Sequence, residues 1–195
     1  MKRPATATVV VVLVILLATA AIVAAVGLGT DGATAITVGD QKLSKQSFND
    51  ELNDWADFEA SKARSTDGSV TATAGSTITT QTIYEMLATS YLDRTGGKVT
   101  AADRKTAADS VAGSADFKQA SQSFRDRYLR RQATFAALTR LVGTDDQGTT
   151  ELRVLRREAR RTGVSVAAAY GRFAPVSVRV VPYPTPFTPT TSAQG

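Results

Sequence analysis

The sequence contains neither cysteine nor histidine. Without cysteine the chain has no disulfide, no thiolate nucleophile and no lipid-modified cysteine after a leader. Without histidine it lacks the commonest general base and the commonest transition-metal ligand, so a Ser-His-Asp triad is excluded. We therefore predict no catalytic residues, no metal site and no cofactor, and we expect a binding protein, not an enzyme.

Charge is present in both signs but is unevenly placed. The chain has 195 residues, a hydrophobic fraction of 43% and a net charge of +5, which suits one domain of moderate size. Acidic residues dominate between Ile36 and Glu59, whereas ten arginines lie between Phe124 and Arg161. We expect the acidic and basic helices to pair, with an effect on orientation more than on stability.

The first thirty residues form a separate segment. Lys2 and Arg3 precede an uncharged run from Val9 to Leu28 that is interrupted only by Thr19. About 20 apolar residues match a bilayer core, and the basic start predicts a cytoplasmic N-terminus with the domain outside. A cleaved signal, at 18–20 or 33–35, is the competing interpretation, although its apolar region would be unusually long. The predicted location is the cell membrane, single-pass, or secreted after cleavage.

A short hairpin and an amphipathic helix follow. Ile36 to Leu43 alternates as two strands around the turn Gly39-Asp40, and Ser44 is a good N-cap. The next apolar residues fall at steps of four, three and three, which predicts one buried helical stripe. They are Phe48, Leu52, Trp55 and Phe58, and we expect Asn49, Asp50, Glu51, Asn53, Asp54 and Asp57 on the solvated side.

The remainder is predicted to be mainly α-helical. Residues 65–80, rich in Ser, Thr, Gly and Ala, indicate a mobile loop. We predict helices at 80–93, 100–112, 115–142 and 150–162, the second opened by a capping box of Thr100 and Asp103, and a bend at 121–123. Val164 and Val166, then Val176 to Val180 after a turn at 170–173, indicate strands that pair with the first hairpin, and 183–195 is predicted to be disordered.

Several short motifs resemble the SurA N-terminal domain family of exported chaperones. Residues 38–48, a strand, a tight turn, a second strand and a serine-capped helix with Phe48 inside, are similar to the opening of that domain. Gly97-Lys98-Val99-Thr100 resembles the entry to its third helix, and 164–166 with 170–175 resembles the closing segment of membrane-anchored actinobacterial members. Ala167-Ala168-Ala169 and Phe173 depart from that closing pattern, where Asp-Pro-Arg and Trp are expected.

The resemblance implies a SurA N-terminal-like domain over 35–182, a peptide-holding module without the parvulin isomerase domain. It predicts ATP-independent binding of unfolded or extended polypeptide through an apolar, helix-walled groove. The alternative is a membrane-anchored adaptor that holds one envelope partner. A peptidyl-prolyl isomerase is a further alternative that only the name of the family suggests. The predicted partners are exported polypeptides and, through the N-terminal helix, the membrane; no nucleic acid is expected.

Six aromatic residues are candidates for the groove, and the alternative for each is a place in the core or at its rim. They are Trp55, Phe58, Tyr84, Tyr91, Phe124 and Tyr128. The arginines at 125–131 and 153–161 favour a solvated helix face, with acidic or carboxylate-bearing client segments and anionic lipid head groups as the other candidates for their partners. Asp145 and Asp146 indicate a turn, with no convergent partners for acid-base or metal chemistry.

Overall fold

The computed structural model describes residues 33–58, 63–143, 145 and 148–183. As predicted, this part of the chain is mainly helical with short strands near its two ends. The helices are α1 (Lys45–Phe58), α3 (Ala72–Thr95), α4 (Ala101–Val111), α5 (Ala115–Gln119), α6 (Gln122–Val142), α7 (Thr149–Thr162) and the 3-10 turn η1 (Ala168–Tyr170). The strands are β1 (Thr34–Val38), β2 (Gln41–Ser44), β3 (Val164–Val166), β4 (Arg172–Ala174) and β5 (Arg179–Val181).

The two ends of the domain are joined in one sheet. β1 lies between β2 and β3 and is antiparallel to both. Ile36 pairs with Val166, and the Gly39 amide donates to the Gly163 carbonyl at 3.2 Å. The predicted pairing of the hairpin with 164–166 is therefore confirmed. The second valine strand does not join this sheet, because β5 pairs with β4 in a separate two-stranded sheet.

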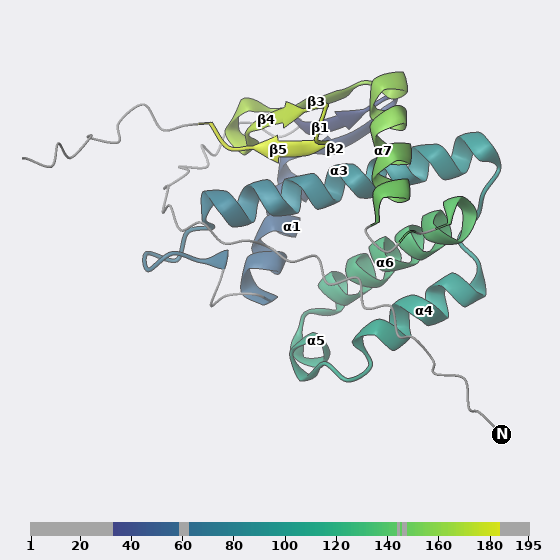
Figure 1. Ribbon diagram of the computed structural model, residues 1–195. Coiled ribbons are helices and arrows are strands. Elements are labelled where there is room, and N and C mark those ends of the chain that lie inside the picture. Colours follow the sequence, from purple (N-terminus) through teal and green to yellow (C-terminus); the bar gives the residue numbers. More distant parts are fainter. Residues whose placement is uncertain (1–32, 59–62, 144, 146–147, 184–195) are drawn as a thin grey trace, which may run out of the picture.

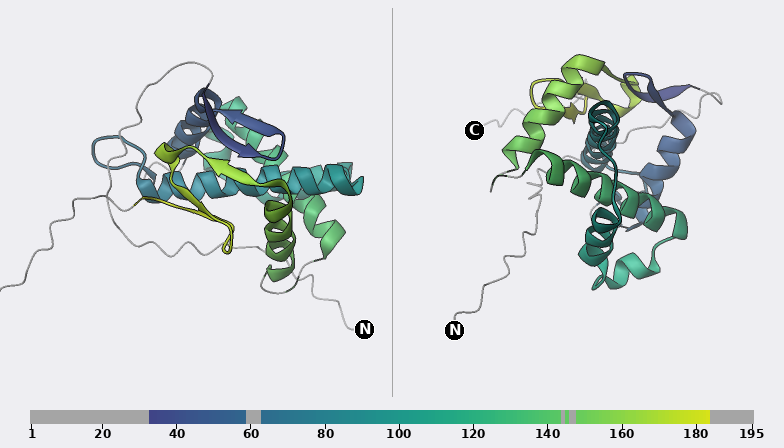
Figure 2. Two further views of the ribbon diagram at one scale, coloured as in Figure 1. Left: turned by 90° about the horizontal axis from the view of Figure 1, so that it is seen from above. Right: turned by 90° about the vertical axis from the view of Figure 1, so that its right-hand side faces the viewer.

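The long helix α3 separates the strands from the remaining helices. Figures 1 and 2 show the strands on one side of α3 and α4 and α6 on the other, with α7 standing across it. Ile83 and Leu87 of α3 are fully buried, as are Ile36 and Val38 of β1. Phe48 of α1 is also fully buried and meets the Tyr170 ring edge-on at 4.8 Å. The core thus lies between α3 and the strands, with α1 beside it.

The predicted loop at 65–80 is wrong in its second half. α3 begins at Ala72, where Thr71 caps it by accepting from the Ala74 amide at 3.2 Å. Helix is stable here because Ile78 reaches the core and is 5% exposed. The hydroxyl of Thr79 also donates to the Gly75 carbonyl at 2.6 Å, so its polar group is satisfied within the helix.

The predicted helix over 115–142 is two helices. α5 ends at Gln119, and α6 starts after Ser121, whose hydroxyl accepts from the Phe124 amide at 3.1 Å. The bend expected at 121–123 is thus a complete break, because a serine that caps a new helix cannot continue the old one.

The closing segment differs from its predicted turn and strand. The turn expected at 170–173 is η1 followed by β4, and 175–178 is a turn where a strand was expected. Gly171 has φ 113°, and a Cβ at this position would lie 2.7 Å from the Val181 carbonyl oxygen. The close approach of β5 therefore requires glycine here.

The predicted leader at 1–30 and, apart from Tyr183, the predicted tail at 183–195 lie outside the described residues, so both stay predictions. Within the described ranges, each helix is either too short or too polar to cross a membrane.

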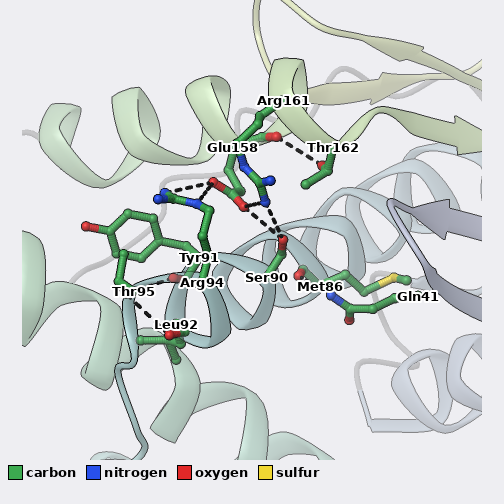
Figure 3. Close-up of polar contacts among 10 residues, drawn as sticks. All are labelled: Gln41, Met86, Ser90, Tyr91, Leu92, Arg94, Thr95, Glu158, Arg161 and Thr162. Carbon is green, nitrogen blue, oxygen red and sulfur yellow. Dashed lines mark hydrogen bonds and ion pairs between the residues drawn. The ribbon is translucent and has the colours of Figure 1, made fainter.

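A buried carboxylate links α7 to α3 (Figure 3). Glu158 is 1% exposed, and its Oε1 accepts a hydrogen bond from the Ser90 hydroxyl at 2.8 Å. Arg161 donates to the same oxygen, and Arg94 donates to Oε2 at 3.2 Å. Burial raises the pKa of Glu158, but the hydrogen bonds from Arg161, Ser90 and Arg94 outweigh it and hold the pKa below its ordinary value.

A second buried carboxylate links α4 to α6. The predicted capping box is confirmed: the Asp103 amide donates to the Thr100 hydroxyl at 3.2 Å, and the Thr100 amide donates to Asp103 Oδ2 at 2.8 Å. Arg140 of α6 donates to both oxygens of Asp103. These bonds, that of Arg140 foremost, lower the pKa of Asp103 to about 2.

Candidate functional site

Four of the six predicted site residues meet at the seam between α1, α5 and α6. The Trp55 ring lies 5.2 Å from the Phe124 ring and 5.5 Å from the Tyr128 ring, and the Phe58 ring lies 4.8 Å from that of Phe124. Phe117 of α5 joins them, 5.3 Å from Tyr128. We call these five rings the aromatic cluster. Phe117 was not among the predicted site residues, because its place here depends on the break before α6.

The aromatic cluster is partly sealed. Phe124 and Phe117 are buried, at 2% and 7% exposed, whereas Trp55, Phe58 and Tyr128 are half-buried. Edge-on and tilted contacts between rings stabilise such a cluster by about 0.5–1.5 kcal/mol per pair beyond area burial. The rings therefore form a small second core that keeps an accessible margin.

Tyr84 and Tyr91 lie elsewhere. Both project from α3 and pack against the main core with half-buried rings. Burial raises the pKa of the Tyr84 hydroxyl, despite the nearby charges of Arg179 and Arg156, and the guanidinium of Arg94 lies 5.3 Å from the Tyr91 ring. The structure does not bring these two residues to the aromatic cluster, because α3 presents them to a different side.

A hollow of about 400 Å³ opens at the margin of the aromatic cluster. We call it the acidic hollow, since its walls carry three carboxylates beside the rings of Phe58 and Phe124. Its lining residues are Asp54, Asp57, Phe58, Asp116, Gln119, Ala120, Ser121 and Phe124. None of these described lining residues is a lysine or an arginine.

Two of the three carboxylates in the acidic hollow already have cationic partners. Asp54 pairs with Arg127 of α6, and Arg64 Nη2 lies 2.5 Å from Asp57 Oδ1. Asp116, in the first turn of α5, is exposed and forms no ion pair with any described residue. Asp116 is therefore the carboxylate left to meet a cation from outside.

A second hollow, of about 270 Å³, lies on the other side of the Asp54–Arg127 pair, between the hairpin, α1, α3 and α6. We call it the basic hollow. Its lining residues are Gln41, Lys42, Leu43, Glu51, Thr82, Glu85, Met86, Arg127, Arg130 and Arg131. Gln41 also donates from Nε2 to the Met86 carbonyl at 3.1 Å, which joins the hairpin to α3 (Figure 3).

Beside the basic hollow, Arg131 is buried in a polar network. It is 4% exposed; its Nε donates to Glu85 at 2.8 Å, and its Nη2 pairs with Glu51. Thr82 also donates to Glu51, at 2.8 Å. Burial lowers the pKa of Arg131, and the charges of Glu51 and Glu85 more than offset this, so the pKa lies above its ordinary value.

This network corrects two predictions. Glu51 was expected on the solvated side of its helix but is 6% exposed, and Arg131 was expected on a solvated face. Each is buried because it neutralises the other, which single-helix periodicity does not reveal. The predicted pairing of the acidic first helix with a later basic helix is confirmed by Glu51–Arg131 and Asp54–Arg127.

The arrangement suits binding by contact and charge. The described residues contain no group of three or more acidic side chains placed to hold a metal ion. Among 33–58, 63–143, 145 and 148–183, the side chains that converge at the two hollows are aromatic, aliphatic, amide, hydroxyl and charged groups, and Asp116, Lys42 and Arg130 are the charged ones outside ion pairs.

Comparisons with protein-family models, curated proteins and solved structures found no match. The resemblance to SurA N-terminal domains therefore stays a prediction from the sequence motifs.

Proposed function

We propose that this domain binds extended or unfolded polypeptide outside the cytoplasm, without ATP, at the acidic hollow. The observation that carries the proposal is the meeting of the Phe58 and Phe124 rings with three carboxylates around about 400 Å³. Small hollows that combine apolar walls with a few placed polar groups are typical of ligand sites. The occupant that we propose is a segment carrying a lysine or arginine beside apolar side chains.

Charge complementarity supports this occupant. A cationic side chain entering the acidic hollow would meet Asp116, which has no cationic partner among the described residues. Its aliphatic stem would lie along the half-buried ring of Phe58, as the stems of lysine and arginine do on apolar surfaces. This revises the expectation that arginines select acidic segments, at least for this hollow.

The binding that we propose is weak and reversible. At about 25 cal/mol per Å², burial of a few hundred Å² of apolar surface leaves only a modest affinity after the ordering of the peptide. Weak binding suits a protein that holds clients and releases them without ATP. The exported location, the membrane anchor within 1–30 and kinship with SurA N-terminal domains are parts of the same proposal, supported by the sequence patterns.

The test uses Trp55, which is the single tryptophan of the chain and belongs to the aromatic cluster. The full chain in a non-ionic detergent is titrated with an amidated peptide of alternating lysine and leucine while tryptophan emission is recorded. We expect saturable binding that Phe58→Ala weakens about tenfold, the effect of losing one well-placed apolar anchor. Tyr91→Ala is the matched control, a half-buried helical aromatic away from the hollow.

Equal losses in the two variants, or no saturable signal in the unaltered chain, would overturn the proposal. Light scattering of an aggregating client then tests the holding activity: excess protein should suppress aggregation, and Phe58→Ala should suppress it less. Crosslinking in membranes addresses the adaptor alternative, because one dominant adduct would indicate a single dedicated partner and many adducts would indicate a range of clients.

A further inference from the structure

We infer that the basic hollow binds the C-terminal residue of a polypeptide, with the carboxylate at Lys42 and Arg130 and an apolar side chain against Leu43 and Met86. This inference rests on the proposed function only in taking polypeptide as the ligand. It concerns a different hollow with different lining residues, and the ligand group is an anion where the acidic hollow is proposed to take a cation.

Two cations of the basic hollow are available to a ligand. Lys42 on β2 and Arg130 on α6 are both exposed, and neither forms an ion pair within the described part of the chain. They come from elements far apart in the sequence, so the fold brings them to one hollow. Two separate cations can bind the two oxygens of one carboxylate, and such charge-assisted hydrogen bonds are about twice as strong as neutral ones.

The other charged residues of the basic hollow already form ion pairs within the fold. Arg127 pairs with Asp54, and Arg131 pairs with both Glu51 and Glu85. The two glutamates share one guanidinium, so this group keeps one net negative charge beside the hollow. Arg131 also keeps one donor, Nη1, without a hydrogen-bond acceptor among the described residues. With Asp54 counted as the partner of Arg127, the four cations that line the hollow face three carboxylates, so the local net charge is still positive because of Lys42 and Arg130.

The apolar lining favours a chain end over an aspartate or glutamate side chain. Leu43 and Met86 line the same hollow as Lys42 and Arg130. In a C-terminal residue, the carboxylate and the side chain are attached to the same Cα, so one residue can satisfy both surfaces. An acidic side chain brings no apolar group with its carboxylate. A hollow of about 270 Å³ lies just below the usual range for small-molecule sites and suits a single residue.

The experiment uses the full chain, labelled with ¹⁵N, in a non-ionic detergent. Three probes are compared: N-acetyl-Ala-Ala-Leu as the free acid, the same peptide as its C-terminal amide, and the amide of N-acetyl-Ala-Glu-Ala, whose only carboxylate is a side chain. Amide shifts of Lys42 and its neighbours report binding at the hollow. We expect the free acid to bind about tenfold more tightly than either amide, the loss expected for one charge-assisted contact.

Arg130→Gln and Lys42→Gln should each reduce the preference for the free acid by about tenfold. Both residues are exposed and unpaired within the described residues, so the fold is expected to survive. Arg153→Gln is the matched control, because Arg153 is an exposed arginine on α7 that lines neither hollow. It removes the same charge and should leave the preference unchanged.

Equal affinity for the free acid and its amide would overturn the inference. So would a preference that Arg153→Gln reduces as much as Arg130→Gln, since the cause would then be overall charge. Tighter binding of the internal glutamate probe than of the free acid would contradict the choice of a chain end. The lysine-leucine titration of the acidic hollow separates this inference from the proposed function, because either hollow can fail while the other binds.

Discussion

Two helix contacts in this domain are each centred on a buried charged group, and the two central groups have opposite signs. Between α3 and α7 the buried group is an acid, Glu158, whose arginine partners Arg94 and Arg161 have side chains 41% and 49% exposed. Between α1 and α6 the buried group is a cation, Arg131, and its carboxylate partners have side chains only 8% and 23% exposed. The two contacts therefore differ in the solvent exposure of the side chains that pair with the buried group.

This difference in exposure determines whether the charged partners are hydrated or buried after the central residue is replaced. When Glu158 is removed, Arg94 and Arg161 remain hydrated at the surface. When Arg131 is removed, Glu51 remains as a charge with little access to water. An uncompensated buried charge is costly, whereas an exposed one is not. The central group has ionic partners in both contacts, but we expect its replacement to lower the unfolding free energy much more in one contact than in the other.

The largest effect is expected from Arg131→Met. It keeps much of the side-chain length but removes the cation that contacts both Glu51 and Glu85. Breaking a buried ion pair on one side costs about 3–5 kcal/mol of unfolding free energy. Urea unfolding followed by circular dichroism measures it, with Arg130→Met on the exposed neighbouring position as the control. A loss of less than about 1 kcal/mol would mean that Glu51 finds water, and the comparison would fail.

A smaller effect is expected from Glu158→Gln. The amide oxygen can still accept from Ser90, and the two arginines stay hydrated, so the loss is about 1–2 kcal/mol, near that of a hydrogen bond to a charged group. Thermal unfolding of this variant beside Arg131→Met sharpens the comparison directly. If both variants lose the same stability, partner exposure is not what separates the two contacts.

The pH dependence of stability at Asp103 tests the same expectation, that a buried charge with well-hydrated partners contributes modestly to stability. Its pKa is lowered from 3.8 to about 2, chiefly by the hydrogen bond from Arg140, whose side chain is 42% exposed. A lowered pKa means that the contribution to stability is complete above pH 3.8 and is lost as the pH falls toward 2. Asp103→Asn should cost about 1 kcal/mol at neutral pH, as capping residues do, and should reduce the loss of stability below pH 4.

Urea midpoints at pH 7, 4 and 2.5 measure that change, and Asp109→Asn on the same helix is the control. An unchanged acid slope in Asp103→Asn would show that other carboxylates dominate the transition.

The smallest effect is expected where both partners are exposed. Lys105 and Asp109 on α4 pair at 2.7 Å, with side chains 75% and 62% exposed. Lys105→Met should change the unfolding free energy by about 0.5 kcal/mol or less. A loss above about 1 kcal/mol would break the ordering of the series by partner exposure. High salt should remove the small effect that remains, as a second measurement in 1 M sodium chloride would show.

Local sequence signals predicted the elements of this fold well where the relevant interaction is near in the chain. The Ser44 and Thr100 caps, the Gly39-Asp40 turn and the amphipathic stripe of α1 depend on neighbours a few positions away, and all are present. The start of α3 was placed too late, because the burial of Ile78 stabilises a helix that the small and polar residues of 72–79 do not themselves favour.

The candidate site was predicted only in part for the same reason. Trp55 and Phe58 share a face of α1, and Phe124 and Tyr128 share a face of α6, so their apolar stripes could be read from spacing. Tyr84 and Tyr91, two turns apart on α3, also share a helical face, yet they face another side of the molecule, and spacing within one helix cannot show this. The burial of Glu51 depends on Arg131, 80 positions later, which is beyond any local pattern.

The central position of β1 has a consequence for how the chain acquires its native form. Ile36 pairs with Val166, about 130 residues later, so one neighbour of the strand is among the last parts of the domain to be made. A chain delivered from its N-terminus across a bilayer would present β1 with an open edge until β3 arrived. Pairing between strands that are far apart in the sequence slows folding, and the strand edge stays exposed until the pairing forms. If the protein binds unfolded polypeptide as proposed, a partly exported copy of this same chain, with β1 still unpaired on one side, would be one of its ligands.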